Sequence, residues 1–469
     1  MRINRIKKRY WLLGIPFLIL ISALLSLYDG KIASDIGNEY GSLVLRNVNV
    51  ISMKAGEGQL RSKQLVYISN GVIKTIEPDY GQPVEADIEI NGEGKYLIPG
   101  LIDAHTHFFD VKDLPQSISY GVTSVRVMSG FPMHLRWREK ISKGAIVGPR
   151  MIISTPAFNY GKNIGPFHIN VDDIDIHSKI KSYKEKGYDL VKVYSGLKKD
   201  HLKEIHSTAE KIDVDVAGHL PDDIEAVDAF FGKKLVSVEH VELISEVIFG
   251  NKPDSSNMAT YNNRLLRGKI AVVPTMTVIK NNVQVLEEGD EFIKQHAPLV
   301  NPLIKKMFVN KRVKRLKQAS KGLQNAFIEE NELNKVILKG LHANKVTIVA
   351  GTDTGPIYTI NGLSLLQELE TYVENGFSSY EALETATTNA ATLLGYKRLG
   401  QISEGYIADL VLLNENPLED IKAIHNREGV ITVNKYFNSD KLHKLLEIAK
   451  DKTGYYRTVV RLLESKIFL

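Results

Sequence analysis

Residues 101–107, LIDAHTH, are an apolar run that ends on two histidines, and the sequence pattern changes at this point. Between residues 42 and 98, short runs rich in Val, Ile and Leu are separated by Gly, Asn, Asp and Pro, which is typical of strands in a small sheet. From residue 100 to about residue 394, runs of strand length alternate with helical segments. This alternation indicates parallel strands joined by helical crossovers.

The repeated strand and helix units predict an α/β fold. Eight such strands favour a closed (β/α)8 barrel, the TIM barrel, over an open sheet. The expected strands span residues 101–107, 122–128, 150–155, 189–194, 214–219, 234–240, 270–275 and 346–353.

The segments on either side of the barrel carry strand patterns of their own. We expect residues 42–98 and 400–438 to pair into one composite, split β-sandwich domain beside a barrel domain of residues 99–399. Apolar residues at helical spacing predict a helical tail over residues 439–469.

The segment between the last two barrel strands, residues 276–345, is long and heavily charged. One interpretation is a lid over the barrel mouth or an anion-binding or membrane-binding surface. The other is a solvated helix whose buried stripe is formed by Phe308, Val309, Val313, Leu316 and Leu323.

The amino terminus has the pattern of a membrane anchor. A basic segment, residues 1–10, precedes an uncharged and mostly apolar run at residues 11–28. At 1.5 Å per residue, this run reaches about 27 Å, the thickness of a bilayer core. The positive flank predicts a cytoplasmic start, a transmembrane helix, and a body on the extracytoplasmic (periplasmic or extracellular) side. A signal sequence whose cleavage releases the body is the alternative.

Composition excludes several classes of function. A net charge of +5 over 469 residues gives no support for nucleic-acid binding. The chain has no cysteine, which excludes disulfides, thiolate metal sites and a cysteine nucleophile. A metal would have to be held by histidine, carboxylate or a group made from lysine.

Two histidines end the first barrel strand. His105 and His107 are two residues apart, so strand alternation places both imidazoles on the same, inward side. Reactive groups of such barrels lie at the carboxyl ends of the strands, where both nitrogens would reach one ion. Taken alone, the pair has another interpretation, in which the two histidines bind no metal and form hydrogen bonds to a neighbouring loop.

A lysine occupies an inward position of the fourth strand. In residues 190–194, LVKVY, the two valines share one face, and Lys192 and Tyr194 share the other. A buried ammonium is costly, whereas a neutral amine can react with carbon dioxide to give a carbamate that bridges two ions. The alternative is a lysine that extends from the strand end to water.

Three further polar residues end other strands. His219 ends the fifth strand, His240 ends the sixth, and Asp353 closes the eighth within AGTDTG. Each alone has an ordinary explanation, as a loop-edge histidine or a turn cap. Together with His105, His107 and Lys192, they converge on one mouth, which predicts a metal centre.

These motifs, with PGLIDAHTH, DLVKVYSG, VEH and AGTDTG among them, resemble the amidohydrolase superfamily over about residues 43–438. The similarity is best to its imidazolonepropionase-like and prolidase-like branch, which carries a lysine on the fourth strand. The resemblance implies a TIM barrel with a split β-sandwich, two divalent metal ions, most often zinc, and hydrolysis of an amide or related bond.

The resemblance also implies a role for each residue. His105, His107 and Asp353 would hold the first ion, His219 and His240 the second, and carboxylated Lys192 would bridge them. The segment after His219, residues 220–225, is LPDDIE instead of the Gly-containing segment of dipeptide-cleaving members. The resemblance therefore does not identify the substrate, which is expected to be a small molecule or a short peptide.

The expected function is metal-dependent hydrolysis of carbon–nitrogen bonds by a metal-activated water. Asp353 would be the catalytic proton acceptor, and Tyr194 would contact the substrate or the pocket wall. The same centre could hydrolyse a lactone, carbamate or phosphoester. A catalytically silent, membrane-tethered binding or scaffold protein is the alternative from another class. The sequence does not indicate the oligomeric state.

Overall fold

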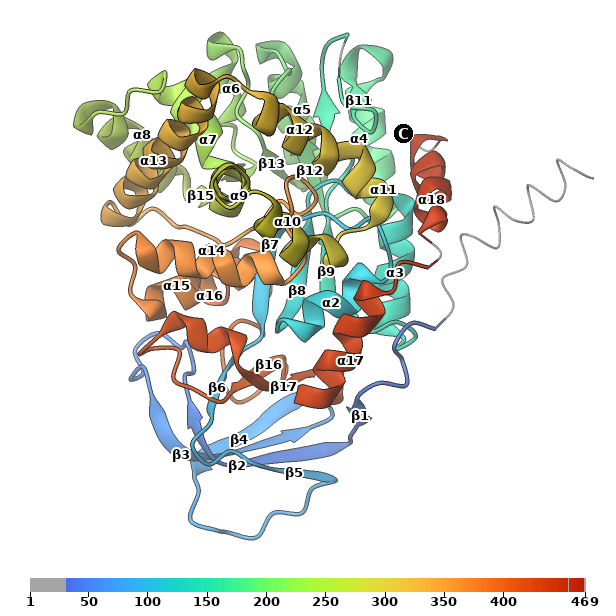
Figure 1. Cartoon of the computed structure of the whole chain (residues 1–469), viewed down its shortest axis with the longest axis vertical. Coiled ribbons are helices and arrows are strands. Elements are labelled where there is room, and N and C mark those ends of the chain that lie inside the picture. The colour runs from blue at the N-terminus through green and yellow to red at the C-terminus, as the bar shows by residue number, and fades with distance from the viewer. Residues whose placement is uncertain (1–30, 163, 454, 468–469) are drawn as a thin grey trace, which may run out of the picture.

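The structure, a computed structural model, describes residues 31–162, 164–453 and 455–467. Figure 1 shows a body of helices packed around strands, with a separate β-sheet at one end. The strands of the body fall into two parallel groups. The first contains β7 (Leu101–Thr106), β8 (Val122–Val127) and β9 (Arg150–Ile153), and the second contains β11 (Ile169–Asn170), β10 (Phe158–Asn159), β12 (Leu190–Val193), β13 (Asp215–Gly218), β14 (Leu235–Glu239) and β15 (Ala271–Val273).

Hydrogen bonds join the two groups edge to edge. A bridge between Ser154 and Leu190 links the end of β9 to β12, and a bridge between Val272 and Ile348 continues from β15. The amide of Ala104 in β7 donates to the carbonyl of Ala350 at 2.9 Å, so the pairing returns to β7. The last expected strand, residues 346–353, therefore pairs on both edges over a short stretch and forms no full ladder.

The strands are buried on both faces because helices cover the outside and side chains fill the inside. All six residues of β7 and of β8 are buried. In β12, Val191 and Val193 join the core that includes Ile180 and Ile205 of the covering helices. Lys192, on the opposite face of β12, lines an internal pocket. The alternation read from the sequence thus decides which side chains reach the interior.

Helices follow most of these strands and pack against their outer faces (Figure 1). They are α2 (Asp113–Ser119), α3 (Pro132–Ser142), η1 (Val171–Asp173), α4 (Ile176–Glu185), α5 (Lys199–Ile212), η2 (Ile224–Ala226), α6 (Val227–Phe230), α7 (Val241–Leu243), η3 (Ile244–Ile248), α8 (Ser255–Gly268), α14 (Leu363–Glu374), α15 (Ser379–Thr385) and α16 (Thr388–Leu393).

Residues 276–345 fold into a set of helices, here called the helical cover. They are α9 (Met276–Glu287), α10 (Asp290–His296), η4 (Ala297–Leu299), α11 (Pro302–Ile304), η5 (Lys305–Val309), α12 (Asn310–Gln318) and α13 (Lys321–Ala343). Of the expected buried stripe, Val309 and Leu316 are buried in a core of their own. Phe308 and Leu323 are exposed instead. Since Val278, Phe308 and Arg312 line the internal pocket, this segment covers it.

The sheet at the other end joins the early and late β segments. Its strand order is β1-β18-β17-β16-β6-β2-β3-β4, with β5 beside β2. Hydrogen bonds connect all nine strands into one sheet, where the sequence predicted a sandwich. The strands are β1 (Asn38–Glu39), β2 (Ser42–Val50), β3 (Arg61–Ser69), β4 (Val72–Pro78), β5 (Ile88–Asn91), β6 (Tyr96–Pro99), β16 (Leu410–Leu413), β17 (Arg427–Thr432) and β18 (Lys435–Asn438).

The end of the described chain is helical. A short helix, η6 (Ile421–His425), lies between β16 and β17, and α17 (Ser439–Lys450) and α18 (Tyr456–Ile467) follow the sheet. Leu442 and Leu445 of α17 pack into the main core. The tail therefore lies against the body, beside α2 and α3 (Figure 1).

The structure corrects one expectation from the amino terminus. In residues 31–162, 164–453 and 455–467, no helix has the length and apolar character needed to cross a bilayer. The expected basic segment and anchor, residues 1–10 and 11–28, lie outside the described residues. The predicted localisation, a membrane-anchored body on the extracytoplasmic side, is contradicted by this finding, and membrane partnership is withdrawn with it.

Candidate active site

The two histidines at the end of β7 meet the aspartate that follows the last paired segment. Nε2 of His107 lies 2.8 Å from Oδ1 of Asp353, and Nε2 of His105 lies 3.5 Å from the same oxygen. One ligand-capable atom from each of the three residues can be chosen so that all lie within 4.8 Å of one another. The spacing suits a shared metal ion.

A buried carboxylate orients His105. Nδ1 of His105 donates to Oε2 of Glu239 at 2.7 Å, and both side chains are almost fully buried. Glu239 in turn accepts from Nη2 of Arg126 at 2.8 Å. Since the carboxylate can only accept, a neutral His105 keeps its lone pair on Nε2, which faces Asp353.

Three histidines of the site, His105, His219 and His240, have lowered pKa values, which favours the neutral form that ligation requires. Burial, followed by the charge of Lys192, lowers the pKa of His105 and of His219 well below the ordinary value. Burial also lowers the pKa of His240 to about 4. Asp353 is held in its charged form instead. Burial opposes its ionisation, but the hydrogen bond and charge of His107 hold its pKa below the usual range.

Lys192 points into the same pocket without a polar partner. Its side chain is 2% exposed, and among the described residues Nζ forms no hydrogen bond. Burial lowers the pKa of this amine to about 8, against the opposing charges of Glu239 and Asp353. An amine in this setting is unsatisfied as an ammonium and is easily deprotonated.

His219 and His240 follow β13 and β14 and lie beside the cluster of His105, His107 and Asp353. Their ring centroids are 4.4 Å apart, and His240 lies 4.7 Å from the ring of His105. Nδ1 of His240 and Oγ1 of Thr275 are 2.8 Å apart, which fixes this ring. Tyr194 stacks beside His219 with centroids 3.9 Å apart.

Two of these residues adopt unusual backbone conformations. His240 has φ of 71° and Asp353 has φ of 48°, both in the left-handed region that costs energy for residues other than glycine. Each stands where a strand ends. Both side chains line the pocket.

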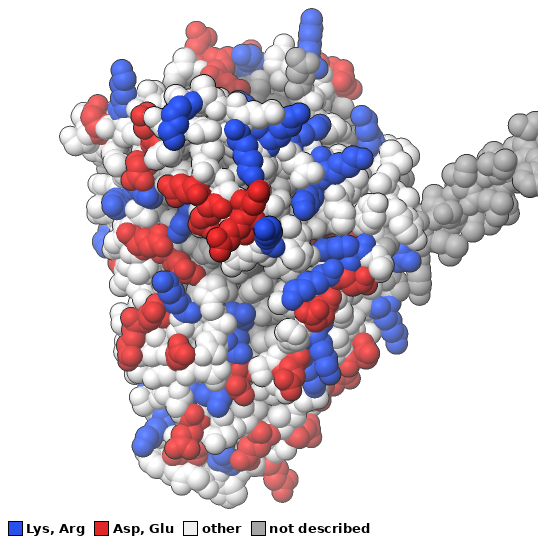
Figure 2. Space-filling view, viewed as in Figure 1, with Lys and Arg blue, Asp and Glu red and all other residues white. Residues whose placement is uncertain are grey.

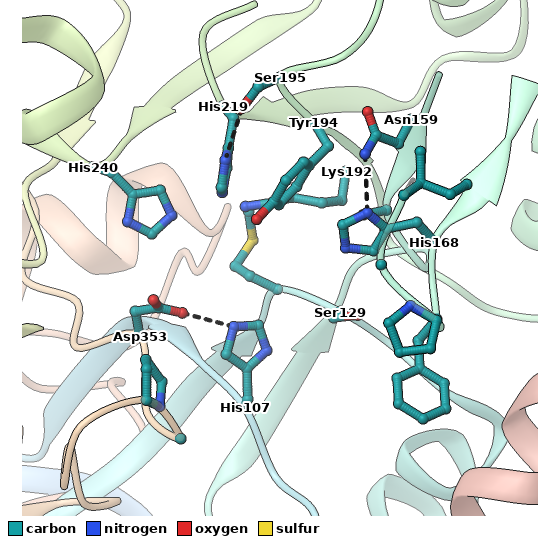
Figure 3. Close-up of a pocket in the computed structure, with 18 of the residues that line it drawn as sticks. His107, Ser129, Asn159, His168, Lys192, Tyr194, Ser195, His219, His240 and Asp353 are labelled. Carbon is teal, nitrogen blue, oxygen red and sulfur yellow. Dashed lines mark hydrogen bonds and ion pairs between the residues drawn. The ribbon is translucent and has the colours of Figure 1, made fainter. Parts of the chain in front are cut away.

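The structure brings all the predicted site residues to one pocket of about 950 Å³. Figure 3 shows His240 and Asp353 on one side, Asn159 and His168 on the other, and Lys192 with Tyr194 between them. Within the described part of the chain, only His105, His107 and Asp353 form a cluster tight enough that it could hold a metal ion. His219, His240 and Lys192 line the pocket next to it.

Several residues that line the pocket or support its histidines were not predicted. Arg126 and Glu239 occupy inward positions of β8 and β14, so the alternation that selected Lys192 would also have selected them. His168 lies after a loop, where Asn159 contacts its Nδ1 at 3.1 Å, and no periodic pattern indicates it. Arg312 comes from the helical cover, whose relation to the mouth is not visible in the sequence.

Comparison with known proteins finds a matching family model. The model of a family described as "Amidohydrolase family" matches residues 96–436. Ochratoxinase of Aspergillus niger is 43% identical over 91 residues, and the match covers 19% of this chain and 18% of that enzyme. The chain thus matches less than a fifth of that relative's length.

Two solved structures are similar over most of the chain. A Xaa-Pro dipeptidase with bound methionine has a TM-score of 0.66 and 19% identity, and the alignment covers 85% of this chain and 100% of the other. A bottromycin amidohydrolase has a TM-score of 0.71 and 20% identity, with coverage of 92% and 93%. At these identities, the similarity concerns the fold.

Proposed function

The chain belongs to the amidohydrolase family, and from this premise we propose that it is a metal-dependent hydrolase of amide-type carbon–nitrogen bonds. The observation that carries the proposal is the cluster of His105, His107 and Asp353, whose ligand-capable atoms lie within 4.8 Å of one another. A relative that matches part of the chain is an ochratoxinase, and a structural neighbour is a dipeptidase.

The proposal includes the finer assignment of the fold. The ring of paired strands is taken as the (β/α)8 barrel of residues 99–399, and the nine-stranded sheet as the composite domain of residues 42–98 and 400–438. The pairing that returns from Ala350 to β7 supports the first assignment. The prolidase-like branch is proposed because Lys192 lies inside the ring.

The residues present fit a pair of divalent ions, with zinc as the expected metal. His105, His107 and Asp353 would hold one ion, and His219 and His240 the other. Neutral imidazoles with one carboxylate are typical zinc ligands. Lys192 fits the role of a bridging carbamate, because its buried amine has no hydrogen-bond partner among the described residues and a pKa lowered to about 8, and the neutral amine is the form that reacts with carbon dioxide. When bound, the ions would supply Lewis acidity and a water of lowered pKa.

The side chains then have separate tasks. Asp353 accepts the proton of the attacking water and passes it to the leaving nitrogen. Tyr194 is positioned to donate a hydrogen bond to the substrate carbonyl, and burial raises its pKa to about 12, so the phenol keeps its proton. Glu239 acts through His105, whose ring it holds in place.

A substrate screen with the full chain tests the function. Dipeptides, N-acyl amino acids and lactones would be compared before and after removal of metal by a chelator. We expect hydrolysis of amide bonds that is lost with the metal and restored by zinc. Metal-independent hydrolysis, or a preference for lactones over every amide, would contradict the proposal.

The role of Asp353 is tested by Asp353→Asn, which keeps the side-chain volume but removes the proton acceptor. We expect kcat to fall by about 1,000-fold. Asp290→Asn, at an exposed position on the helical cover, is the matched control and should leave kcat unchanged. A variant at position 353 with normal kcat would exclude the residue from proton transfer.

A further inference from the structure

A buried carboxylate joins three segments that are far apart in the sequence. Asp110 lies in the loop between β7 and α2, after His107. Its Oδ2 accepts hydrogen bonds from Nδ2 of Asn301 at 3.1 Å and from Oγ1 of Thr458 at 3.3 Å. Nη1 of Arg461 lies 3.8 Å from its Oδ1. The loop after β7, the helical cover and α18 therefore meet at one side chain. Asp110, Asn301, Thr458 and Arg461 are here called the Asp110 cluster.

The members of the Asp110 cluster are buried and depend on one another. Asp110 is 8% exposed and Asn301 is 5% exposed, while Thr458 and Arg461 are almost fully buried. Nδ2 of Asn301 also donates to Oγ1 of Thr458 at 3.1 Å, so the amide, the hydroxyl and the carboxylate contact one another in pairs. When one partner of such a network is removed, the others stay buried without their hydrogen bonds. The cluster should therefore respond strongly to small changes.

On the side of the cover, Asn301 begins the helical run that reaches the pocket. The elements α11, η5 and α12 follow one another without a break over residues 302–318. Oδ1 of Asn301 accepts from the backbone N–H of Leu303 at 2.9 Å and so caps the first turn. Phe308 and Arg312 of the same run line the pocket. The Asp110 cluster thus holds the start of the helical run that forms part of the pocket wall.

The charges of this helical run do not fix it to the body. Residues 302–321 contain six lysines and two arginines and no acidic residue. Figure 2 shows blue side chains gathered over α11 and α12. Within the described residues, the side chains of this run bond only to other parts of the cover, as Lys317 does to Asp290 at 2.7 Å and Arg312 to Asn282 at 2.9 Å. Exposed ion pairs contribute little to stability. The buried cluster is therefore the polar attachment of this run to the body.

On the side of the loop, Asp110 holds another part of the pocket wall. Phe109 directly precedes it and lines the pocket, and its ring centroid is 6.4 Å from that of Phe308. The backbone N–H of Asp110 donates to Oδ2 of Asp113 at 3.1 Å, which fixes the loop there. The two rings that approach each other at the pocket thus follow from the two partners of one hydrogen bond, Asp110 and Asn301.

His107, in the same loop, has supports of its own. Its backbone N–H donates to Oγ1 of Thr354 at 2.9 Å. Its carbonyl accepts from Oγ1 of Thr354 at 2.9 Å and from Nδ2 of Asn361 at 3.3 Å. A change in the Asp110 cluster should therefore displace the aromatic walls of the pocket and leave the candidate metal ligands in place.

Further contacts keep α18 on the body. Nη1 and Nη2 of Arg136 in α3 donate to the two carboxylate oxygens of Glu464 at 2.6 and 2.7 Å. Nζ of Lys112 donates to Oδ2 of Asp451, between α17 and α18, at 2.7 Å. Figure 1 shows α18 beside α3 and α11. The loss of one hydrogen bond in the Asp110 cluster should therefore loosen the cover without releasing α18.

We propose that Asp110 is a positioning residue through which α18 holds the helical cover against the pocket and lowers KM. No described side chain of α18 lines the pocket, so the helix acts only through the Asp110 cluster. The effect on KM rests on the proposed amide hydrolysis, whereas the effect on the cover does not.

Hydrogen–deuterium exchange of the full chain tests the effect on the cover without a substrate. Thr458→Val keeps the shape of the side chain and removes the hydroxyl that donates to Asp110 and accepts from Asn301. We expect the backbone amides of residues 305–318 to exchange about 3- to 10-fold faster than in the wild type. The amides of α5, which has no contact with the cluster, should keep their rates.

Ser465→Ala is the matched control, because Ser465 is also buried in α18 but its hydroxyl donates within the helix, to the carbonyl of Arg461 at 2.7 Å. It should leave residues 305–318 as in the wild type. Thr458→Ser keeps the hydroxyl and should restore the slow exchange. Faster exchange confined to α18 in Thr458→Val, or the same response of the cover in Ser465→Ala, would overturn the proposal.

A second substitution keeps the test decisive if Thr458→Val does not fold. Asp110→Asn keeps the volume of the side chain, but an amide nitrogen cannot accept a hydrogen bond, so the cluster loses at least one of its bonds. Exchange in residues 305–318 should again rise by about 3- to 10-fold. Unchanged exchange in this variant would overturn the proposal.

Steady-state kinetics tests the effect on catalysis. The metal-loaded enzyme would be measured with the dipeptide or N-acyl amino acid that the wild type hydrolyses fastest. Thr458→Val should raise KM by about three- to tenfold, with kcat within about twofold and the metal content unchanged. Thr458→Ser should restore KM, and Ser465→Ala should not change it. A fall in kcat at constant KM would overturn the proposal.

The two measurements distinguish the two levels of inference. Faster exchange of the cover in a protein that hydrolyses no amide would support the role of Asp110 in holding the cover and overturn the hydrolase. Amide hydrolysis with unchanged exchange and KM in Thr458→Val would support the hydrolase and overturn the role of Asp110. Faster exchange with an unchanged KM would overturn the link between α18 and substrate binding.

Discussion

The ring of paired strands, formed by β7, β8, β9, β12, β13, β14, β15 and residues 346–350, and the helical cover contribute to the same pocket in different ways. Side chains of the ring, such as His105 and Glu239, are almost fully buried and bonded to one another. Side chains of the cover, such as Phe308 and Arg312, are exposed or only partly buried and contact few partners. The ring is therefore suited to hold reactive groups in fixed geometry, and the cover to decide which molecule reaches them.

The largest effect is expected at Lys192, in the middle of the ring. Lys192→Ala should reduce kcat by at least about 1,000-fold, because it removes the group proposed to bridge the metal pair. Added short-chain carboxylic acids should restore part of the activity by supplying a carboxylate in the vacated space. Lys203→Ala, at an exposed position of α5, is the control. Full activity of the variant at position 192 would remove it from the centre.

Because the two regions are packed differently, the same Gly→Ala substitution should change the free energy of unfolding by amounts that differ by about 3 kcal/mol. A Cβ atom at Gly351 would lie 2.5 Å from Cγ1 of Val273 and 2.8 Å from Cβ of His105, while one at Gly322 of α13 would meet nothing within 4 Å. Gly351→Ala should lower the free energy of unfolding by about 2–3 kcal/mol. Gly322→Ala should raise it by about 0.5 kcal/mol. Denaturant titration measures both, and equal effects would show that the ring is no more tightly packed than the cover.

A smaller effect is expected from the residue that supports His105. Glu239→Gln removes the charge that Arg126 and His105 face and should reduce zinc affinity or kcat/KM by about 10- to 100-fold. Zinc titration of the metal-free protein checks the affinity directly. Glu291→Gln, exposed on the cover, should change neither quantity. An unchanged affinity in Glu239→Gln would mean that His105 needs no support.

The smallest effect is expected at the edge of the cover. Phe308→Ala removes an apolar ring that lines the cavity beside Phe109, so KM for an apolar substrate should rise by about three- to tenfold. The value of kcat should stay within about twofold, because no reactive group moves. Steady-state kinetics measures KM and kcat separately. A large fall in kcat would mean that Phe308 affects the chemical step and not only substrate binding.

The same difference explains what the sequence can predict. His105, His107, Lys192, His219, His240 and Asp353 could be selected because each stands at or near the end of an apolar run with a period of two. That period places them inside the ring, and parallel strands bring their carboxyl ends to one mouth. The structure places all of them in one pocket, while their roles as ligands stay predictions.

Contacts between distant segments could not be predicted in this way. Arg126 and Glu239 are 113 residues apart, and their bond depends on which strands lie across the ring. Arg312 reaches the pocket because the cover folds back over it, which local periodicity does not encode. The split sandwich was predicted from alternation, but a pattern of strands does not reveal that hydrogen bonds join all nine into one sheet.

The count of bound metal ions tests the central claim most directly. Elemental analysis of the purified full chain, grown with zinc, should find about two equivalents per chain, about one in His219→Ala, and the lower value again in His105→Ala. Activity should fall in step with the metal content. A fully active chain without divalent metal, or a metal content that neither substitution changes, would contradict the proposed centre.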